Sequence, residues 1–138
     1  MTSALVDTNV WLDIILSRPE HFDASANVVN LLARPEHSAY VAGHTVTTIY
    51  YLVAKARDER KAMTAVRALL DDAVVAAVGG MELREAAQSD IDDFEDAVVA
   101  AAARRAGIDA IITRNAADFR KSRLAVYTPV EFVTSFGR

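Results

Sequence analysis

Oxygen-bearing side chains recur in this 138-residue sequence where an apolar run ends or a helical pattern begins. Asp7 directly follows a short apolar run near the N-terminus. Asp93 and Asp96 stand near the start of an alanine-rich stretch, and Asn115 and Asp118 follow another apolar run. Carboxylate and amide oxygens are hard ligands that suit Mg²⁺ or Mn²⁺. Several acids in one pocket repel each other without a cation, so convergence of these residues would predict a divalent-metal site.

Two interpretations of Asp7 follow from its surroundings. The apolar run 4–6 is typical of a strand, and apolar residues at helical spacing begin at Val10. Asp is a favoured helix cap, so Asp7 could simply cap the next helix. In an open parallel sheet, however, ligands bind outside the carboxyl ends of the strands, where a carboxylate at this position would hold a metal.

The stretch 92–106 predicts a buried helix, because apolar residues lie on both of its sides. Asp96 precedes one of these apolar stripes, so its side chain should point inward, where carboxylates are rare unless paired or bound to metal. Asp93 lies on the same side, one turn earlier. Three further acids are interpreted as ordinary helix-start residues that favour the positive end of the helix dipole: Asp90, Asp92 and Glu95.

The segment after the apolar run 108–112 combines polar and basic residues. Thr113, Asn115 and Asp118 could form no more than a turn, since Asn and Asp favour turns by bonding their own backbone. At the end of a strand in a doubly wound sheet, they would instead face the same crevice as Asp7 and Asp96. The basic residues here could contact phosphates outside a metal site, or form a solvated loop: Arg114, Arg120, Lys121 and Arg123.

Strands alternate with helices along the chain, which predicts an α/β fold with a parallel sheet and helices on both faces. The expected strands are 4–6, 38–42, 73–78, 108–113 and 124–127, and the strand 73–78 is expected to be buried. Thr45 is expected to cap the third helix. Thr128, Pro129 and Glu131 form a strong helix start, with a capping residue, a proline and a reciprocal glutamate.

The three histidines, His21, His37 and His44, fall in predicted loops, and His44 is the one nearest the predicted crevice. Net charge is −4, so a polyanionic substrate would need a local basic patch or a metal. The sequence has no cysteine, no apolar run of membrane-spanning length and no signal-peptide pattern at its start. A cytoplasmic protein is expected.

Three segments, 6–10, 93–97 and 112–119, resemble the signature segments of PIN domains, most closely the VapC-like bacterial toxin branch. The resemblance continues into 128–132 and covers essentially the whole chain, which indicates a single PIN-like domain over 1–138. It implies a three-layer α/β/α fold with a central parallel sheet. It also implies an Mg²⁺- or Mn²⁺-dependent endoribonuclease, often the toxin of a type II toxin–antitoxin pair, with an RNA substrate, a cognate antitoxin protein and a homodimeric assembly.

Carried over residue by residue, the resemblance implies that Asp7 and Asp96 bind metal. Asn115 would occupy the family's third acidic position, with Asp118 or Asp93 as a further ligand or helper. The implied catalytic residues are Asp7, Asp96 and Asp118. The implied supporting residues are Thr113, Asn9 and Thr48.

One departure from the family pattern concerns Thr48, which stands where many members carry a glutamate. Together with Asn115, it removes two formal negative charges, so metal affinity should fall. This leaves open a second interpretation, a catalytically weak or inactive PIN-like domain that binds RNA or protein. A third, phosphoryl transfer through an aspartyl nucleophile at Asp7, is disfavoured because Asn9 stands where its general acid would be.

Overall fold

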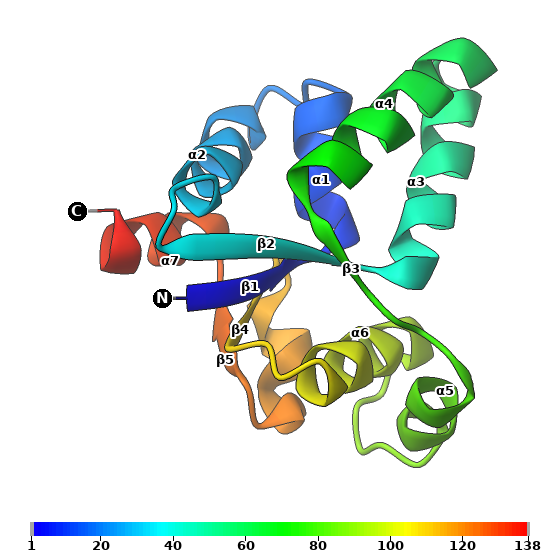
Figure 1. Cartoon of the computed structure of the whole chain (residues 1–138), viewed down its shortest axis with the longest axis vertical. Coiled ribbons are helices and arrows are strands. Elements are labelled where there is room, and N and C mark those ends of the chain that lie inside the picture. Colours follow the sequence, from blue (N-terminus) through cyan, green and yellow to red (C-terminus); the bar gives the residue numbers. More distant parts are fainter. Residues whose placement is uncertain (1, 138) are drawn as a thin grey trace.

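The computed structural model describes residues 2–137, which form a five-stranded parallel sheet between two layers of helices (Figure 1). The predicted parallel α/β architecture is therefore confirmed. The strands are β1 (Thr2–Val6), β2 (His37–Ala42), β3 (Val74–Ala76), β4 (Ala110–Ile112) and β5 (Ala125–Tyr127). The α-helices are α1 (Thr8–Ile15), α2 (Phe22–Leu32), α3 (Gly43–Ala56), α4 (Glu59–Asp72), α5 (Gly80–Ala87), α6 (Phe94–Arg105) and α7 (Pro129–Phe136), and η1 (Ala116–Ser122) is a 3-10 helix.

The order of the strands, β3-β2-β1-β4-β5, places β1 at the centre. The chain first builds outward from β1 to β2 and β3, and then returns to the other side of β1 with β4 and β5. The reversal lies between β1 and β4, where the loops leave the sheet in opposite directions. In open α/β sheets this point opens a crevice outside the carboxyl ends of the strands.

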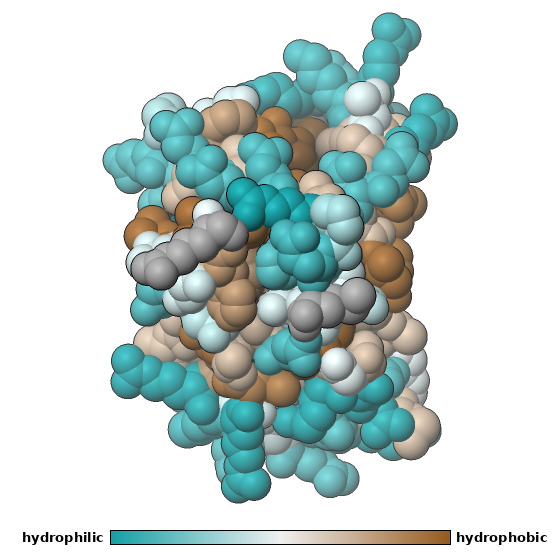
Figure 2. All heavy atoms as spheres, turned by 60° about the vertical axis from the view of Figure 1, so that its left-hand side comes forward, coloured by the Kyte–Doolittle hydropathy of each residue, from teal (hydrophilic) through white to brown (hydrophobic). Residues whose placement is uncertain are grey.

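Two cores lie on the two faces of the sheet. Successive strand residues point to opposite faces, so Val6 and Ile112 pack with α1 to α4 and α7, whereas Leu5 and Ile111 pack with α5 and α6 (Figure 1). The middle of α6, 97–103, is buried throughout, as the apolar residues on both of its sides predict. The side of the molecule from which β1 starts is covered mainly by hydrophilic side chains (Figure 2).

Several local predictions hold, because short-range chemistry determines them. α7 begins with the predicted capping box, in which Thr128 accepts a hydrogen bond from the Glu131 amide and Glu131 accepts one from the Thr128 amide. Trp11 is buried in α1, and its indole N–H donates to the Val6 carbonyl at 2.9 Å. This bond ties the first turns of α1 to the end of β1.

Other local predictions are wrong because tertiary packing determines the burial and the bounds of these elements. The run 73–78 forms only the short edge strand β3, whose Val74 and Val75 are exposed rather than buried. Helix α3 starts at Gly43, so Thr45 is a buried residue of its first turn instead of the cap. Of the histidines expected in loops, His37 lies in β2 and His44 in the first turn of α3. None of the helices within 2–137 is long and apolar enough to span a bilayer.

Close packing around α6 yields a stability prediction. Ala100 is only 1% exposed, so Ala100→Leu must push extra carbons into a filled core. We expect the free energy of unfolding to fall by about 1–3 kcal/mol, as measured by urea unfolding. The exposed Ala87→Leu at the end of α5 serves as control and should change it by less than about 0.5 kcal/mol. Equal unfolding midpoints for the two variants would contradict the packing described here.

Candidate functional site

Asp7 stands at the carboxyl end of the central strand, immediately after Val6. Its backbone is still extended, and its amide donates to the Ile112 carbonyl at 2.9 Å. Because it follows Leu5 by two residues, its side chain turns to the face that α6 covers. The side chain is 4% exposed and accepts from the Thr8 amide at 2.8 Å, so it also caps α1. The capping and site-facing interpretations of Asp7 are therefore compatible.

The second oxygen of the Asp7 carboxylate is held from β4. Thr113 follows Ile111 by two residues, is fully buried, and donates its hydroxyl to Asp7 Oδ2 at 2.9 Å. Its hydroxyl also accepts from the Asn115 amide at 3.1 Å, which folds the 113–115 segment over the end of the sheet. The contact of Thr113 with Asp7 that the sequence predicts is thus present as a hydrogen bond.

Helix α6 delivers the next acids to this point. Asp93 is its N-cap and accepts from the Asp96 amide at 3.0 Å. Asp96 lies in the first turn, half-buried, as its inward position in the sequence pattern predicts. Burial, and then the negative charges of Asp93, Asp7, Glu95 and Asp118, raise the pKa of Asp96 to about 7. Four carboxylates from three parts of the chain therefore contribute to the raised pKa of the Asp96 carboxyl.

Asp7 experiences the same accumulation of negative charge. Burial raises the pKa of its carboxyl, and the charge of Glu95 adds to the rise, while hydrogen bonds from Thr113 and Thr8 oppose it. A buried carboxylate with a raised pKa stores electrostatic repulsion that a nearby cation would relieve. The charges of both Asp7 and Asp118 act on Asp96.

The donor set at this crevice fits a hard divalent cation. Asp93, Glu95 and Asp96 each offer a carboxylate oxygen, and these atoms lie within 4.8 Å of one another. Oxygen donors alone suit Mg²⁺ or Mn²⁺, and the described residues offer no thiolate to compete. Burial is the largest cause of the raised pKa values of Asp7 and Asp96, and the charges of neighbouring acids add to it.

Glu95 is a site residue that the sequence interpretation missed, whereas His44 is the histidine expected nearest the crevice. His44 Nε2 lies 2.6 Å from Glu95 Oε2, which joins the first turn of α3 to the first turn of α6. Glu95 was assigned to ordinary helix-start chemistry because nothing in its local spacing distinguishes it from Asp92. Its proximity to the two predicted acids Asp93 and Asp96 is the sequence signal that could have identified it.

Asp118 reaches the site from η1 and lines a cavity of about 340 Å³. The other lining residues are Ile91, Asp92, Asp93, Asp96, Ala117, Arg120 and Lys121. Two of the four predicted phosphate contacts, Arg120 and Lys121, therefore border the acidic cavity, and Lys121 also lies 3.8 Å from Asp92. Acids toward the sheet and cations at the rim are the charge pattern that a metal-bound phosphate would require.

The other predicted residues have different surroundings. Arg114 is half-buried, and its guanidinium is paired with the buried Asp13. Arg123 ends η1 in a left-handed conformation, with φ 64°, and does not line the 340 Å³ cavity. Asn9 accepts from the Arg114 amide at 3.4 Å. Thr48 is exposed and donates to the His44 carbonyl of its own helix, whereas Thr45 receives the contact from the first segment, through Thr8 at 3.3 Å.

Comparison with known proteins gives a consistent result. The sequence model of the PIN domain matches residues 3–117. VapBC2 from Rickettsia felis, solved with a DNA fragment from its promoter, superposes with a TM-score of 0.73 at 15% identity, covering 92% of this chain and 98% of that one. VapC20 from Mycobacterium tuberculosis, described as a sarcin-ricin loop cleaving toxin, gives 0.65 at 19% identity, with 78% and 86% covered.

A toxin–antitoxin complex from Klebsiella pneumoniae gives a TM-score of 0.69 at 21% identity, covering 91% of this chain and 97% of that one. At such identities these structures show that the fold is shared. Comparison with curated proteins found no match.

The raised pKa of Asp96 predicts how stability depends on pH. Between its ordinary value of 3.8 and about 7, the native state binds more protons than the unfolded state. The free energy of unfolding should therefore fall as pH rises through this interval. Asp96→Asn removes the effect and should stabilise the protein at pH 8 by on the order of 1 kcal/mol, after solvent screening of a half-exposed group. Urea unfolding at pH 5 and pH 8 measures both values.

Asp71→Asn provides the control, because Asp71 is an exposed acid on α4, on the other face of the sheet. Its effect on stability should be the same at both pH values. If the gain from Asp96→Asn were equally independent of pH, the repulsion inferred at the crevice would be wrong.

Proposed function

This chain belongs to the PIN domain family, and on that premise we propose that it is a metal-dependent endoribonuclease, the toxin of a type II toxin–antitoxin pair. One observation carries the proposal. Carboxylates from the end of β1, from α6 and from η1 converge at the switch point of the sheet, where burial and then the charges of neighbouring acids raise the pKa of Asp96 to about 7. PIN domains are generally metal-dependent nucleases, and the solved structures that resemble this chain are VapC-type proteins.

In the proposed reaction, Asp7 and Asp96 would hold an Mg²⁺ or Mn²⁺ ion, and Asn115, Asp118 and Asp93 would supply further oxygen donors. When bound, such an ion offsets negative charge on a phosphodiester and favours deprotonation of water. Thr113 keeps the Asp7 carboxylate in one orientation through its 2.9 Å hydrogen bond. Asp118 or Asp93 orients the attacking water, and Arg120 and Lys121 at the rim bind the flanking phosphates of the RNA.

The proposed partner is an antitoxin protein that covers the acidic crevice. Two of the similar structures are toxin–antitoxin assemblies, VapBC2 from Rickettsia felis and the complex from Klebsiella pneumoniae. An arginine from the antitoxin would pair with Asp7 or Asp96, because a guanidinium matches a carboxylate in a two-point contact. A homodimer in the cytoplasm is part of the same proposal.

Two variants test the catalytic assignment. Asp7→Asn and Asp96→Asn each remove a proposed metal ligand, so cleavage of single-stranded RNA in Mg²⁺ or Mn²⁺ should fall at least about 100-fold, the upper range seen for loss of mere ligand-supporting groups. Mn²⁺ binding by calorimetry should weaken in parallel, while Asp90→Asn, an exposed acid outside the cavity, should leave both unchanged. Wild-type protein that binds RNA but cuts none with either metal would favour the alternative of a non-catalytic binding domain.

Thr48→Glu tests the departure from the family pattern. Thr48 lies one turn after His44 on α3, exposed to solvent, so a glutamate there adds a carboxylate near the crevice. We expect Mn²⁺ to bind about 10-fold more tightly, because an added anionic donor strengthens a hard-cation site. Thr47→Glu, the exposed neighbour on the same helix, is the matched control. Equal affinities in the two variants would show that position 48 does not face the metal.

A further inference from the structure

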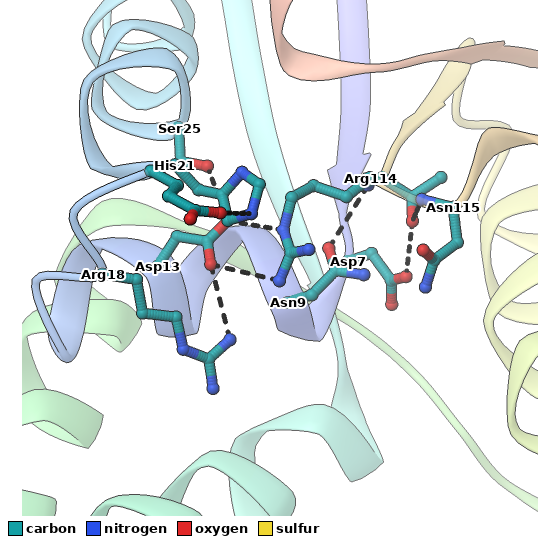
Figure 3. A network of polar contacts seen from close by, with 10 residues as sticks. Asp7, Asn9, Asp13, Arg18, His21, Ser25, Arg114 and Asn115 are labelled. Carbon is teal, nitrogen blue, oxygen red and sulfur yellow. Dashed lines mark hydrogen bonds and ion pairs between the residues drawn. The ribbon is translucent and has the colours of Figure 1, made fainter.

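Asp13 is a fully buried carboxylate that the proposed reaction does not use. It lies on α1 and receives contacts from three other parts of the chain (Figure 3). Ser25 of α2 donates to its Oδ2 at 3.1 Å, and Arg18 of the α1–α2 connection lies 3.4 Å from its Oδ1. Arg114, which follows β4, contacts both oxygens. Charged side chains are rarely buried at this depth without a specific requirement.

The contact with Arg114 has the geometry of a two-point ion pair. Arg114 Nε lies 2.8 Å from Asp13 Oδ2, and its terminal nitrogen lies 3.3 Å from Asp13 Oδ1. The backbone amide of Arg114 is fixed as well, because it donates to Asn9 Oδ1 at 3.4 Å. Both ends of this residue are therefore anchored to α1, the helix that Asp7 caps. A planar fork of this kind defines orientation in addition to charge.

Arg114 stands between two residues of the candidate site. Thr113 on one side donates to Asp7 Oδ2, and Asn115 on the other bonds back to the Thr113 hydroxyl. The position of this short segment decides where the Thr113 hydroxyl and the Asn115 amide lie relative to Asp7. An ion pair to a buried carboxylate contributes little net stability compared with well-packed apolar groups, so the use of this part-buried pair is better explained by orientation.

On the basis of these contacts, and resting on the proposed ribonuclease function, we propose that Asp13 is a positioning residue of the metal site. Through its two-point pair with Arg114, it fixes the 113–115 segment against Asp7. Arg114 accordingly belongs to the internal support of the site and does not bind RNA phosphate. Asp13 itself touches neither metal nor substrate.

The test uses the full chain with two variants and one control. Asp13→Asn keeps the shape of the side chain but removes the charge that holds Arg114. Arg114→Lys keeps the positive charge but removes the planar guanidinium that makes the two-point contact. Arg18→Gln is the control, because it removes a longer contact to the same carboxylate and leaves the Arg114 pair intact. The readouts are hydrogen exchange of the segment 113–118, the Mn²⁺ dissociation constant, and kcat and KM on single-stranded RNA.

Asp13→Asn and Arg114→Lys should both speed exchange in 113–118 and weaken Mn²⁺ binding about 10-fold. They should lower kcat about 100-fold, as displaced catalytic groups do, while KM for RNA changes less than about 3-fold because the rim cations are untouched. Arg18→Gln should resemble wild type in all readouts. Should Asp13→Asn fail to fold, Arg114→Lys provides the same test with the buried carboxylate in place.

Two failures can be distinguished. A wild type that binds Mn²⁺ and cleaves RNA, with unchanged exchange, affinity and kcat in both variants, would overturn the positioning role alone. A wild type that neither binds Mn²⁺ nor cleaves RNA would overturn the proposed function, and the positioning role with it. Equal losses in the Arg18→Gln control would also overturn the proposal, since they would show a general effect of disturbing the buried charge.

Discussion

The hydrogen bond between Thr113 and Asp7 is the interaction on which the candidate site depends. It joins the ends of the two neighbouring strands, β1 and β4, across the point where the strand order reverses. Asp7 is nearly fully buried and satisfies one oxygen with the first amide of α1 and the other with Thr113. A carboxylate at this depth must have such partners, because an unpaired buried charge would be strongly destabilising. The ends of β1 and β4 therefore both hold the Asp7 side chain in place.

The distribution of charge around this bond separates two tasks. Toward α6, acids accumulate, and their charges add to the effect of burial in raising the pKa of Asp96. On the opposite side of the 113–115 segment, Asp13 and Arg114 neutralise each other inside the protein. Because Arg114 is paired with Asp13, its positive charge does not neutralise the acids near α6. Those acids are therefore free to bind a metal cation. On one side, the segment 113–115 thus donates the Thr113 hydroxyl to Asp7. On the other side, it forms the ion pair between Arg114 and Asp13.

Much of the fold was predictable because its rules are local. Alternating strands and helices indicate a parallel sheet, and the capping box at Thr128 depends on residues only three positions apart. The inward aim of Asp96 followed from the apolar residues one turn later, and the structure places it half-buried in the first turn of α6. The metal-binding roles of Asp7, Asp96 and Asp118 stay predictions, although their charges do converge. The prediction of a buried strand at 73–78 was wrong because β3 lies at the edge of the sheet, which no local pattern reveals.

The contacts that sequence reasoning missed share one physical feature, which is that the two partners are distant in the chain. Asp13 meets Arg114 across 101 positions, and His44 meets Glu95 across 51. Glu95 also changes the interpretation of the family glutamate that Thr48 replaces. The acidic charge is supplied from the start of α6, where Asp93, Glu95 and Asp96 lie together and the helix dipole favours anions. His44, one turn before Thr48, contacts this group from the helix that would have carried the glutamate. Although position 48 on α3 carries no acid, the crevice is acidic because of the carboxylates at the start of α6.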